Sequence, residues 1–377
     1  MRSPKFEGRR AFSGRTSPLV LKGARSSLVI IGGSGDVARH LLKLLPPNHT
    51  RNIYLISRGG AIPAEASQLS VTPVSADITD AGFSPELPEE AIVINLTEAT
   101  PPQWIASMIA RGHTVLDTSA SPEYVSGLKT ASKDGGGLLV LCVGTAPGLS
   151  TLMAADVDNH PETEIVEIAL ELGMGRHYGR AATEWFFKAL GNPYRDNPTG
   201  KLVAPGTRSA RVRFAPSEAP RQAIDIGFPD QRVTNANQRQ SPITRLAIDP
   251  PFMTLMISIL IQLGLGSILS RRARFFARVS HYLPNLGRMR TRIAVTAFGA
   301  ERKPIFARYF EGGDQAALTA AMIIITLGAI QTKMVSRSGL TTIADHLDLD
   351  EALSELRIIL PDMKICMRSK ERHEESC

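Results

Sequence analysis

The sequence predicts an α/β protein in which a doubly wound parallel sheet is followed by a second, mixed α+β domain. Three observations support this fold class. With 377 residues and 43% apolar content, the chain is long enough for two packed domains. Between residues 28 and 150, short apolar runs alternate with helical or turn segments, which is the pattern of βαβ units. Beyond residue 150 this regular alternation ends.

Six apolar runs are the expected strands of the parallel sheet. They are residues 28–31, 53–56, 70–74, 91–94, 114–116 and 138–141. Helices are expected at 36–45 and at 101–111, because two prolines suit the first turn of the second helix. Six strands with intervening helices are enough for one doubly wound domain.

The first predicted strand is followed directly by a glycine-rich turn that opens a helix. Glycines let the backbone approach a pyrophosphate closely, and the helix N-terminus offers free N–H groups to it. We therefore expect a Rossmann-type dinucleotide-binding domain over residues 28–150, the alternative being a glycine-rich turn without a ligand. The expected phosphate-binding residues are Gly32, Gly33, Ser34, Gly35, Asp36 and Val37.

The second predicted strand ends in Ser57 and Arg58, with no acid beside them. A carboxylate at this place binds the ribose 2′-hydroxyl of NAD, whereas a guanidinium suits the 2′-phosphate of NADP. The sequence therefore favours NADP as the cofactor, unless Arg58 is an ordinary solvated arginine. After the third strand come Asp77 and Ile78. Asp77 either meets the adenine amino group or forms an Asx turn.

Polar and small residues follow the fourth, fifth and sixth predicted strands. Ligands of open α/β sheets bind at the carboxyl ends of the strands, so these residues should line the nicotinamide side of the site. The expected cofactor contacts are Asn95, Leu96 and Thr97, and the expected substrate-side residues are Thr118, Ser119, Gly144 and Pro147.

Three segments of the chain resemble the saccharopine dehydrogenase-like oxidoreductases, and two more do so faintly. They are the Gly-Gly-Ser-Gly turn, the strand ends 92–97 and 115–119, the run Gly-Thr-Ala-Pro-Gly-Leu-Ser at 144–150 and, faintly, 313–317 and 338–343. The resemblance touches about half of the chain and leaves 175–290 largely uncovered. Where that family often has Ser-x-Gly-Thr, this sequence reads His-Tyr-Gly-Arg at 177–180.

The resemblance implies hydride transfer with a nicotinamide cofactor, commonly at a carbon–nitrogen bond such as an imine. It does not identify a catalytic residue. Asp117 could stabilise a cationic iminium or cap a turn, and His177 and Tyr178 could donate protons from the second domain. Cys142 lies in an apolar run and is expected in the core. Neither metal-ligand spacing nor a nucleophile elbow is found, so no metal is expected.

We divide the chain into a disordered basic tail at 1–27, the Rossmann domain at 28–150, a substrate and dimerisation domain at 151–312, and C-terminal helices at 313–377 that complete the domains. Within the last two regions we expect six elements and a frayed end at 368–377. They are strands 165–172, 293–298 and 305–310 and helices 181–190, 314–331 and 348–357.

Residues 252–269 form an apolar stretch of 18 residues without a charge, which we expect to be one helix. Thr254, Ser258 and Gln262 are four residues apart and would form a polar stripe, and four arginines follow within the next nine residues. Three alternatives stay open for 252–278. It is a buried or dimer-contact helix, a helix on a membrane surface, or a membrane-spanning helix, for which its length is at the lower limit.

The net charge of +7 is concentrated at the N-terminus, where residues 1–27 hold seven basic residues and one acid, a net +6. The rest of the chain is close to neutral, so no nucleic-acid partner is expected. Cys142, Cys366 and Cys377 are scattered, which indicates a reducing compartment and a cytoplasmic location, with or without membrane contact.

Taken together, these features favour an NADP-dependent oxidoreductase, expected as a homodimer, that acts on a small or lipid-like molecule. The alternative is a membrane- or lipid-associated protein that keeps the nucleotide-binding fold without catalysis.

Overall fold

The computed structural model describes most of the chain beyond its first 26 residues. The described residues are 27–47, 52–80, 82–83, 87–89, 91–132, 135–195, 200–228, 242–282, 284–332, 338–369 and 372–376. The expected basic tail therefore lies outside the described residues, except for Ser27, which begins the first strand.

The first sheet has seven parallel strands in the order β15-β6-β5-β4-β1-β2-β3. They are β1 (Ser27–Ile31), β2 (Ile53–Ser57), β3 (Val71–Ser75), β4 (Ala91–Asn95), β5 (Thr114–Asp117), β6 (Leu138–Leu141) and β15 (Gly339–Thr342). The six predicted strands are all present, and their order is that of a Rossmann-type sheet, so the predicted fold class is confirmed. β15 was not predicted as a strand and comes from the C-terminal part of the chain.

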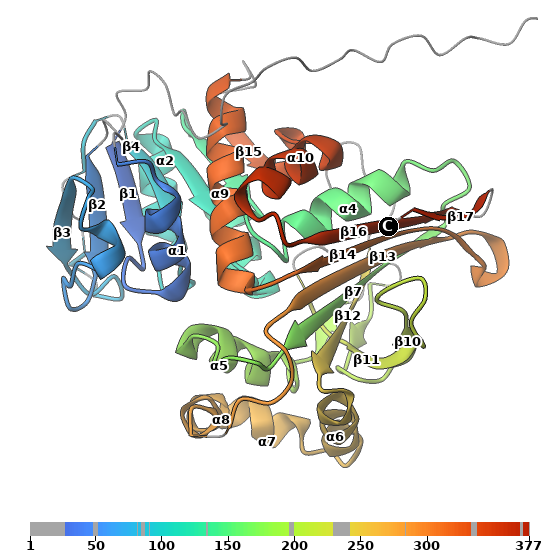
Figure 1. Cartoon of the computed structure of the whole chain (residues 1–377). Helices are drawn as coiled ribbons and strands as arrows, with labels where there is room; N and C mark the ends of the chain where they lie inside the picture. The colour runs from blue at the N-terminus through green and yellow to red at the C-terminus, as the bar shows by residue number, and fades with distance from the viewer. Residues whose placement is uncertain are drawn as a thin grey trace, which may run out of the picture.

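Helices cover both faces of this sheet. On one face α1 (Asp36–Leu44) packs beside α9 (Gln315–Thr332), as Figure 1 shows, over a core that includes Leu28 and Ile30 of β1. On the other face α2 (Pro102–Ala110) and α3 (Pro122–Ala131) share a core with Val29 and Ile31. Successive side chains of a strand point to opposite faces, so a strand covered on both sides is apolar throughout. The short helix η1 (Ala64–Ala66) lies between β2 and β3.

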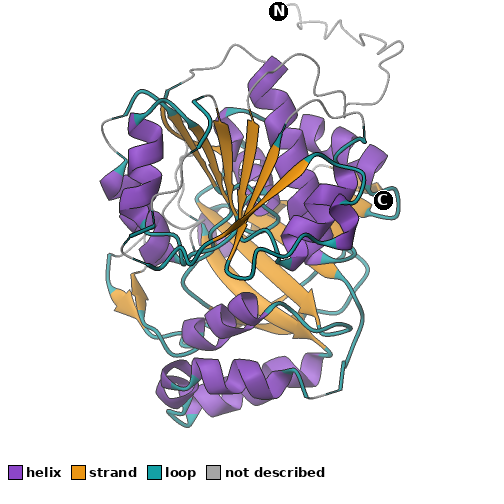
Figure 2. Cartoon of the chain, turned by 90° about the vertical axis from the view of Figure 1, so that its left-hand side faces the viewer, coloured by secondary structure: helices purple, strands orange, loops and turns teal. Residues whose placement is uncertain are grey.

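The second sheet has eight strands in the order β10-β11-β12-β7-β13-β14-β16-β17, and Figure 2 shows it beneath the first. They are β7 (Ile165–Gly173), β10 (Ala210–Val212), β11 (Arg221–Asp225), β12 (Ile243–Asp249), β13 (Thr291–Phe298), β14 (Pro304–Gly312), β16 (Lys364–Ser369) and β17 (Arg372–Ser376). β7 pairs with β12 in parallel and with β13 in antiparallel orientation. The predicted strand 165–172 and the antiparallel pair β13–β14 are confirmed.

Several shorter elements occur between residues 149 and 302, outside the second sheet. α4 (Leu149–Asp158) packs against β7 and β13. β8 (Tyr194–Arg195) and β9 (Leu202–Val203) form a separate pair, and η3 (Ala300–Arg302) lies in the turn between β13 and β14.

After α9 the chain returns to both sheets. β15 adds to the first sheet, and η4 (Ile343–Asp345) and α10 (Leu349–Ile359) follow it, close to the predicted helix 348–357. The predicted frayed end at 368–377 is wrong, because β16 pairs with β14 and β17 pairs with β16. Backbone hydrogen bonding to an existing strand orders a segment whose charge alone suggested a loose end.

The apolar stretch 252–269 is not one helix, and this prediction is wrong. α6 (Pro251–Gln262) ends before Gly264, whose φ of +77° lies in the left-handed region that interrupts a helix. α7 (Gly266–Arg271) and α8 (Ala273–Ser280) follow as separate short helices. They form the lowest layer in Figure 1, and α5 (Arg180–Ala189), which corresponds to the predicted helix 181–190, lies directly above α8.

Within the described part of the chain, α9 is the one helix long and apolar enough to cross a membrane by length and composition. Most of it is buried in this protein, against α1 and α10. Such burial is that of a core helix.

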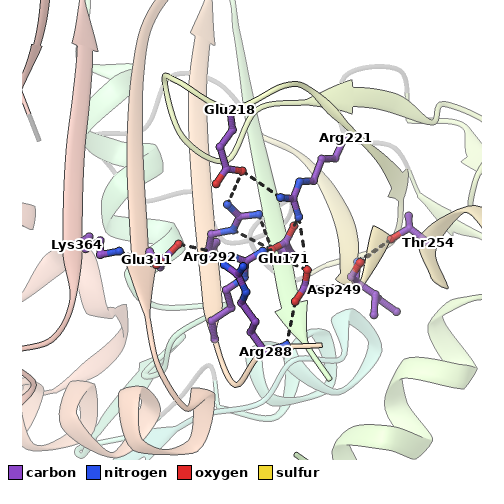
Figure 3. A network of polar contacts seen from close by, with 11 residues as sticks. Glu171, Glu218, Arg221, Asp249, Thr254, Arg288, Arg292, Glu311 and Lys364 are labelled. Atoms are coloured by element: carbon purple, nitrogen blue, oxygen red, sulfur yellow. Dashed lines mark hydrogen bonds and ion pairs between the residues drawn. The ribbon is translucent and has the colours of Figure 1, made fainter. Parts of the chain in front are cut away.

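A buried network of ion pairs joins four strands of the second sheet, and Figure 3 shows it from close by. Glu171 of β7 is completely buried and lies 2.6 Å from Nη2 of Arg292, in β13, and 3.0 Å from Nη2 of Arg290, just before β13. Arg221 Nη1 of β11 lies 3.1 Å from the same carboxylate. Asp249, at the end of β12, is bound by Arg290 at 3.2 Å. Because buried charges are tolerated only when paired, these residues depend on one another.

Candidate active site

The predicted phosphate-binding turn lies between β1 and α1. Gly32 has a φ of +84°, where glycine carries no steric penalty. A side chain at Gly33 would begin 3.1 Å from the Leu55 Cβ, which is tighter than ordinary packing. The turn is closed by a hydrogen bond of 3.0 Å that the Gly35 N–H donates to the Gly32 carbonyl. Glycine is therefore needed at 32 and 33 for the turn itself.

The end of the turn is open to a ligand. Gly35 is the N-cap residue of α1, and no side chain accepts a hydrogen bond from the first helical turn there. Ser34 and Gly35 are both exposed. The uncapped N–H groups and the positive end of the helix dipole together suit an anion such as a pyrophosphate.

The end of β2 offers a second anion-binding feature. Arg58 is exposed and forms no ion pair with a described residue, although its charge contributes to lowering the pKa of the Asp77 carboxyl. Beside it, Ser57 is 8% exposed, and its hydroxyl has no hydrogen-bond partner in the described part of the chain. A buried hydroxyl without a partner is costly, so a ligand atom that bonds to it would stabilise the site.

Asp77 forms an Asx turn after β3. Its Oδ1 accepts hydrogen bonds from the Thr79 N–H at 3.0 Å and from the Thr79 hydroxyl at 2.7 Å. These bonds hold the pKa of the Asp77 carboxyl below its ordinary value. Ile78 is buried beside it. The turn role is thus observed, and contact of Asp77 or Ile78 with an adenine stays a prediction.

At the ends of β4 and β5 the polar side chains bind one another. Asn95 is fully buried and donates through Nδ2 to Asp117 Oδ2 at 2.6 Å, while its Oδ1 accepts from the Thr100 hydroxyl at 2.7 Å. Burial raises the pKa of Asp117 to about 6, against the lowering effect of its bonds from Asn95 and Ser119. The Asn95–Asp117 pair therefore fixes two strand ends beneath the surface of the site.

The neighbouring predicted residues lie closer to the surface. Leu96 lies next to Gly32. A Cβ atom added at Gly32 would be 3.4 Å from the Leu96 Cβ. The Thr97 hydroxyl accepts a hydrogen bond from the Ala99 N–H, and the Thr118 hydroxyl donates to the Asn95 carbonyl at 3.0 Å. The buried Ser119 hydroxyl has no partner among the described residues.

The predicted substrate-side segment after β6 is buried. Gly144 and Pro147 are covered, and the Leu149 N–H donates to the Gly144 carbonyl at 2.9 Å. Between them, Thr145 bonds through its hydroxyl to the Thr319 hydroxyl of α9 at 3.0 Å. This segment joins the sheet to α9, and its contact with a substrate stays a prediction. Cys142 is buried as expected.

The two candidates from the second domain, His177 and Tyr178, have their observed partners outside the glycine turn. The Tyr178 hydroxyl donates to the Gly173 carbonyl at 2.9 Å, and burial raises its pKa. His177 is exposed, and its ring lies 5.6 Å from that of His281 between centroids.

Sequence reasoning missed Arg176, which connects the second domain to the phosphate-binding turn. Its Nη2 lies 2.7 Å from Asp36 Oδ2 in the first turn of α1, and its Nη1 binds Asp314 just before α9. His40 of α1 lies 3.2 Å from the same Asp314 carboxylate. Arg176 and Asp36 are 140 positions apart, so no local pattern could have paired them.

Comparison with known proteins shows the fold. No protein-family model matches the chain, and no curated protein matches it by sequence. Among solved structures, it is similar to a homospermidine synthase from Legionella pneumophila in complex with NAD, with a TM-score of 0.62 and 12% identity over 93% of this chain and 94% of that one. An engineered D-amino acid dehydrogenase matches with a TM-score of 0.41 and 11% identity over 88% of this chain and 99% of that one. The chain therefore shares its fold with the NAD-bound synthase.

Proposed function

We propose that this protein is an NADP-dependent oxidoreductase that transfers a hydride at a carbon–nitrogen bond. The observation that carries the proposal is the open glycine turn at the uncapped N-terminus of α1, with an exposed Arg58 at the end of the next strand and a Ser57 hydroxyl that bonds to no described residue. A dinucleotide with a 2′-phosphate matches both features.

The chain's own residues would have three tasks. The N–H groups after Gly33 would hold the pyrophosphate, and Arg58 would bind the 2′-phosphate with the support of Ser57. Arg176 would offset the negative charge of Asp36, which otherwise lies close to the phosphates. When bound, the nicotinamide ring supplies or accepts the hydride.

The carbon–nitrogen bond is supported by the resemblance described above and by the fold shared with the homospermidine synthase. The two candidate proton donors agree with reduction of a carbon–nitrogen bond. The Asp117 carboxyl is buried, and the Tyr178 hydroxyl is bonded to the backbone. An iminium is already electrophilic, so its reduction relies on binding and orientation more than on an acid.

The test is NADPH consumption by the full chain with a panel of amines and aldehydes, each alone and in pairs. The proposal expects consumption only when an amine and a carbonyl compound are both present. NADPH binding without consumption anywhere in the panel would instead favour the non-catalytic alternative. Failure to bind either NADPH or NADH would overturn the proposal as a whole.

A further inference from the structure

The outer surface of α6, α7 and α8 is apolar and exposed. Of the fifteen large apolar side chains exposed in the described part of the chain, eleven lie between residues 252 and 289. We call this surface the apolar face and define it by Leu255, Ile259, Leu263, Ile268, Phe275 and Val279. Exposed apolar side chains concentrated on neighbouring helices are typical of an interaction site.

The orientation of α6 explains the exposure. Thr254 and Ser258 are buried, and the Thr254 hydroxyl accepts a 2.8 Å hydrogen bond from the Ile248 N–H of β12. Leu255 and Ile259 follow these two residues by one position, about 100° around the helix, and both are exposed, as is Leu263 at the C-cap of α6. Two residues of the polar stripe, Thr254 and Ser258, therefore face the protein, whereas its third residue, Gln262, is exposed together with the apolar side.

The helices of the apolar face are fixed to the rest of the molecule. α8 packs on α5, and the Ser270 hydroxyl donates to Asn192 Oδ1 at 2.7 Å just beyond the end of α5. The Gly266 carbonyl lies so close to Gly191 that position 191 has no space for a side chain. The apolar face is thus a formed surface within the fold.

Positive charges predominate around the apolar face. Residues 250–290 contain six arginines and no aspartate or glutamate. Arg271, Arg272 and Arg278 are exposed and form no ion pair with any described residue. Arg274 pairs with Glu184 at 3.3 Å, yet its side chain is 88% exposed. An occupant of this surface has to combine apolar groups with negative charge.

We propose that the apolar face docks this protein on a membrane surface rich in anionic phospholipid. The apolar side chains would enter the acyl boundary while the arginines meet the phosphates. α6 is 12 residues and therefore about 18 Å long, too short to span the hydrocarbon. A symmetric contact with a second copy is disfavoured, because it would bring the same arginines together without an acid to pair them.

The test is co-sedimentation of the full chain with vesicles of phosphatidylcholine alone and of phosphatidylcholine with phosphatidylserine, at low and high salt. Binding is expected only to the phosphatidylserine vesicles, with release by salt. Leu263→Gln should weaken this binding about tenfold. The matched control is Leu202→Gln, since the two leucines are 69% and 67% exposed, and it should bind like the unmodified protein.

A second pair of variants tests the charge. Arg271→Gln and Arg278→Gln should each weaken binding about fivefold. Arg357→Gln, an exposed arginine of α10, should have no effect. NADPH affinity, measured on every variant, should not change, which separates this inference from the proposed function. Absence of vesicle binding, or a dimer in solution that Leu263→Gln dissociates, would overturn the proposal.

Discussion

Among the acids at the strand ends, Asp117 has the pKa that is shifted furthest from its ordinary value. It is completely buried, and burial raises its pKa from 3.8 to about 6. The folded protein therefore holds this proton more tightly than the unfolded chain does. The stability that Asp117 contributes is fully present below pH 3.8 and is lost as the pH rises through about 6.

Asp117→Asn should remove this dependence on pH. Relative to the variant, the free energy of unfolding of the unmodified protein should fall by about 2 kcal/mol between pH 4 and pH 7. Urea unfolding at several pH values measures the difference. Asp362→Asn, at an exposed position, is the control. If the Asp117→Asn curve ran parallel to that of the unmodified protein, the buried carboxyl would not titrate in this range.

Gly35→Val tests the phosphate-binding turn. A Cβ at this position would begin 3.3 Å from the Gly32 carbonyl oxygen, and the branched side chain would fill the space that a pyrophosphate needs. We expect a folded protein whose melting temperature no longer rises with NADPH. Gly136→Val is the control, because it is exposed with open space around it. A rise in the Gly35→Val protein equal to that of the control would contradict the assignment.

Among the elements, the contact between α1, α9 and the segment after β7 depends on Arg176. Arg176→Ala should lower the free energy of unfolding by about 1 to 3 kcal/mol through the loss of charge-assisted hydrogen bonds. The substitution should also weaken the binding of NADPH and of NADH equally, because Asp36 would then face the pyrophosphate without a counter-charge.

The control for Arg176 is Arg180→Ala, an exposed residue at the start of α5. Urea unfolding and titration with both cofactors are the measurements. Weakening of NADPH alone would show that Arg176 contacts the 2′-phosphate and does not act through Asp36.

The strands of the second sheet depend on the Glu171 network. Glu171→Gln should destabilise the protein by about 3 to 5 kcal/mol, because it leaves Arg290 and Arg292 buried without their shared counter-charge. Glu164→Gln, at an exposed position just before β7, should change stability little. Equal midpoints of urea unfolding for the two variants would show that the network is not needed for stability.

Elements were predictable where the signal was local. The strands of the first sheet are buried on both faces, so their apolar runs mark them directly. The split of 252–269 was missed, since an apolar run gives no sign of the left-handed Gly264 that ends α6. The buried side of α6 was also missed, because Thr254 has its partner in β12, a contact that spacing within the helix cannot show.

For the whole molecule, the sequence predicted a Rossmann-type domain and a second mixed domain, but not how the C-terminal part completes both sheets. β15 is four residues long and is ordered by pairing with β6, about 200 positions earlier in the sequence. The residues of the candidate site likewise fall into those that the local sequence predicts and those that it does not. The glycine turn and Arg58 follow from local sequence, whereas Arg176 and the Asn95–Asp117 pair depend on contacts between distant segments.

The most direct test of the account is calorimetric titration of the full chain with NADPH and with NADH. We expect NADPH to bind at least several-fold more tightly. Arg58→Ala should weaken the binding free energy of NADPH by about 1 to 3 kcal/mol and leave that of NADH nearly unchanged. Arg111→Ala, an exposed arginine at the end of α2, is the control. Equal affinities for the two cofactors in the unmodified protein would contradict the assignment of Arg58 and of NADP.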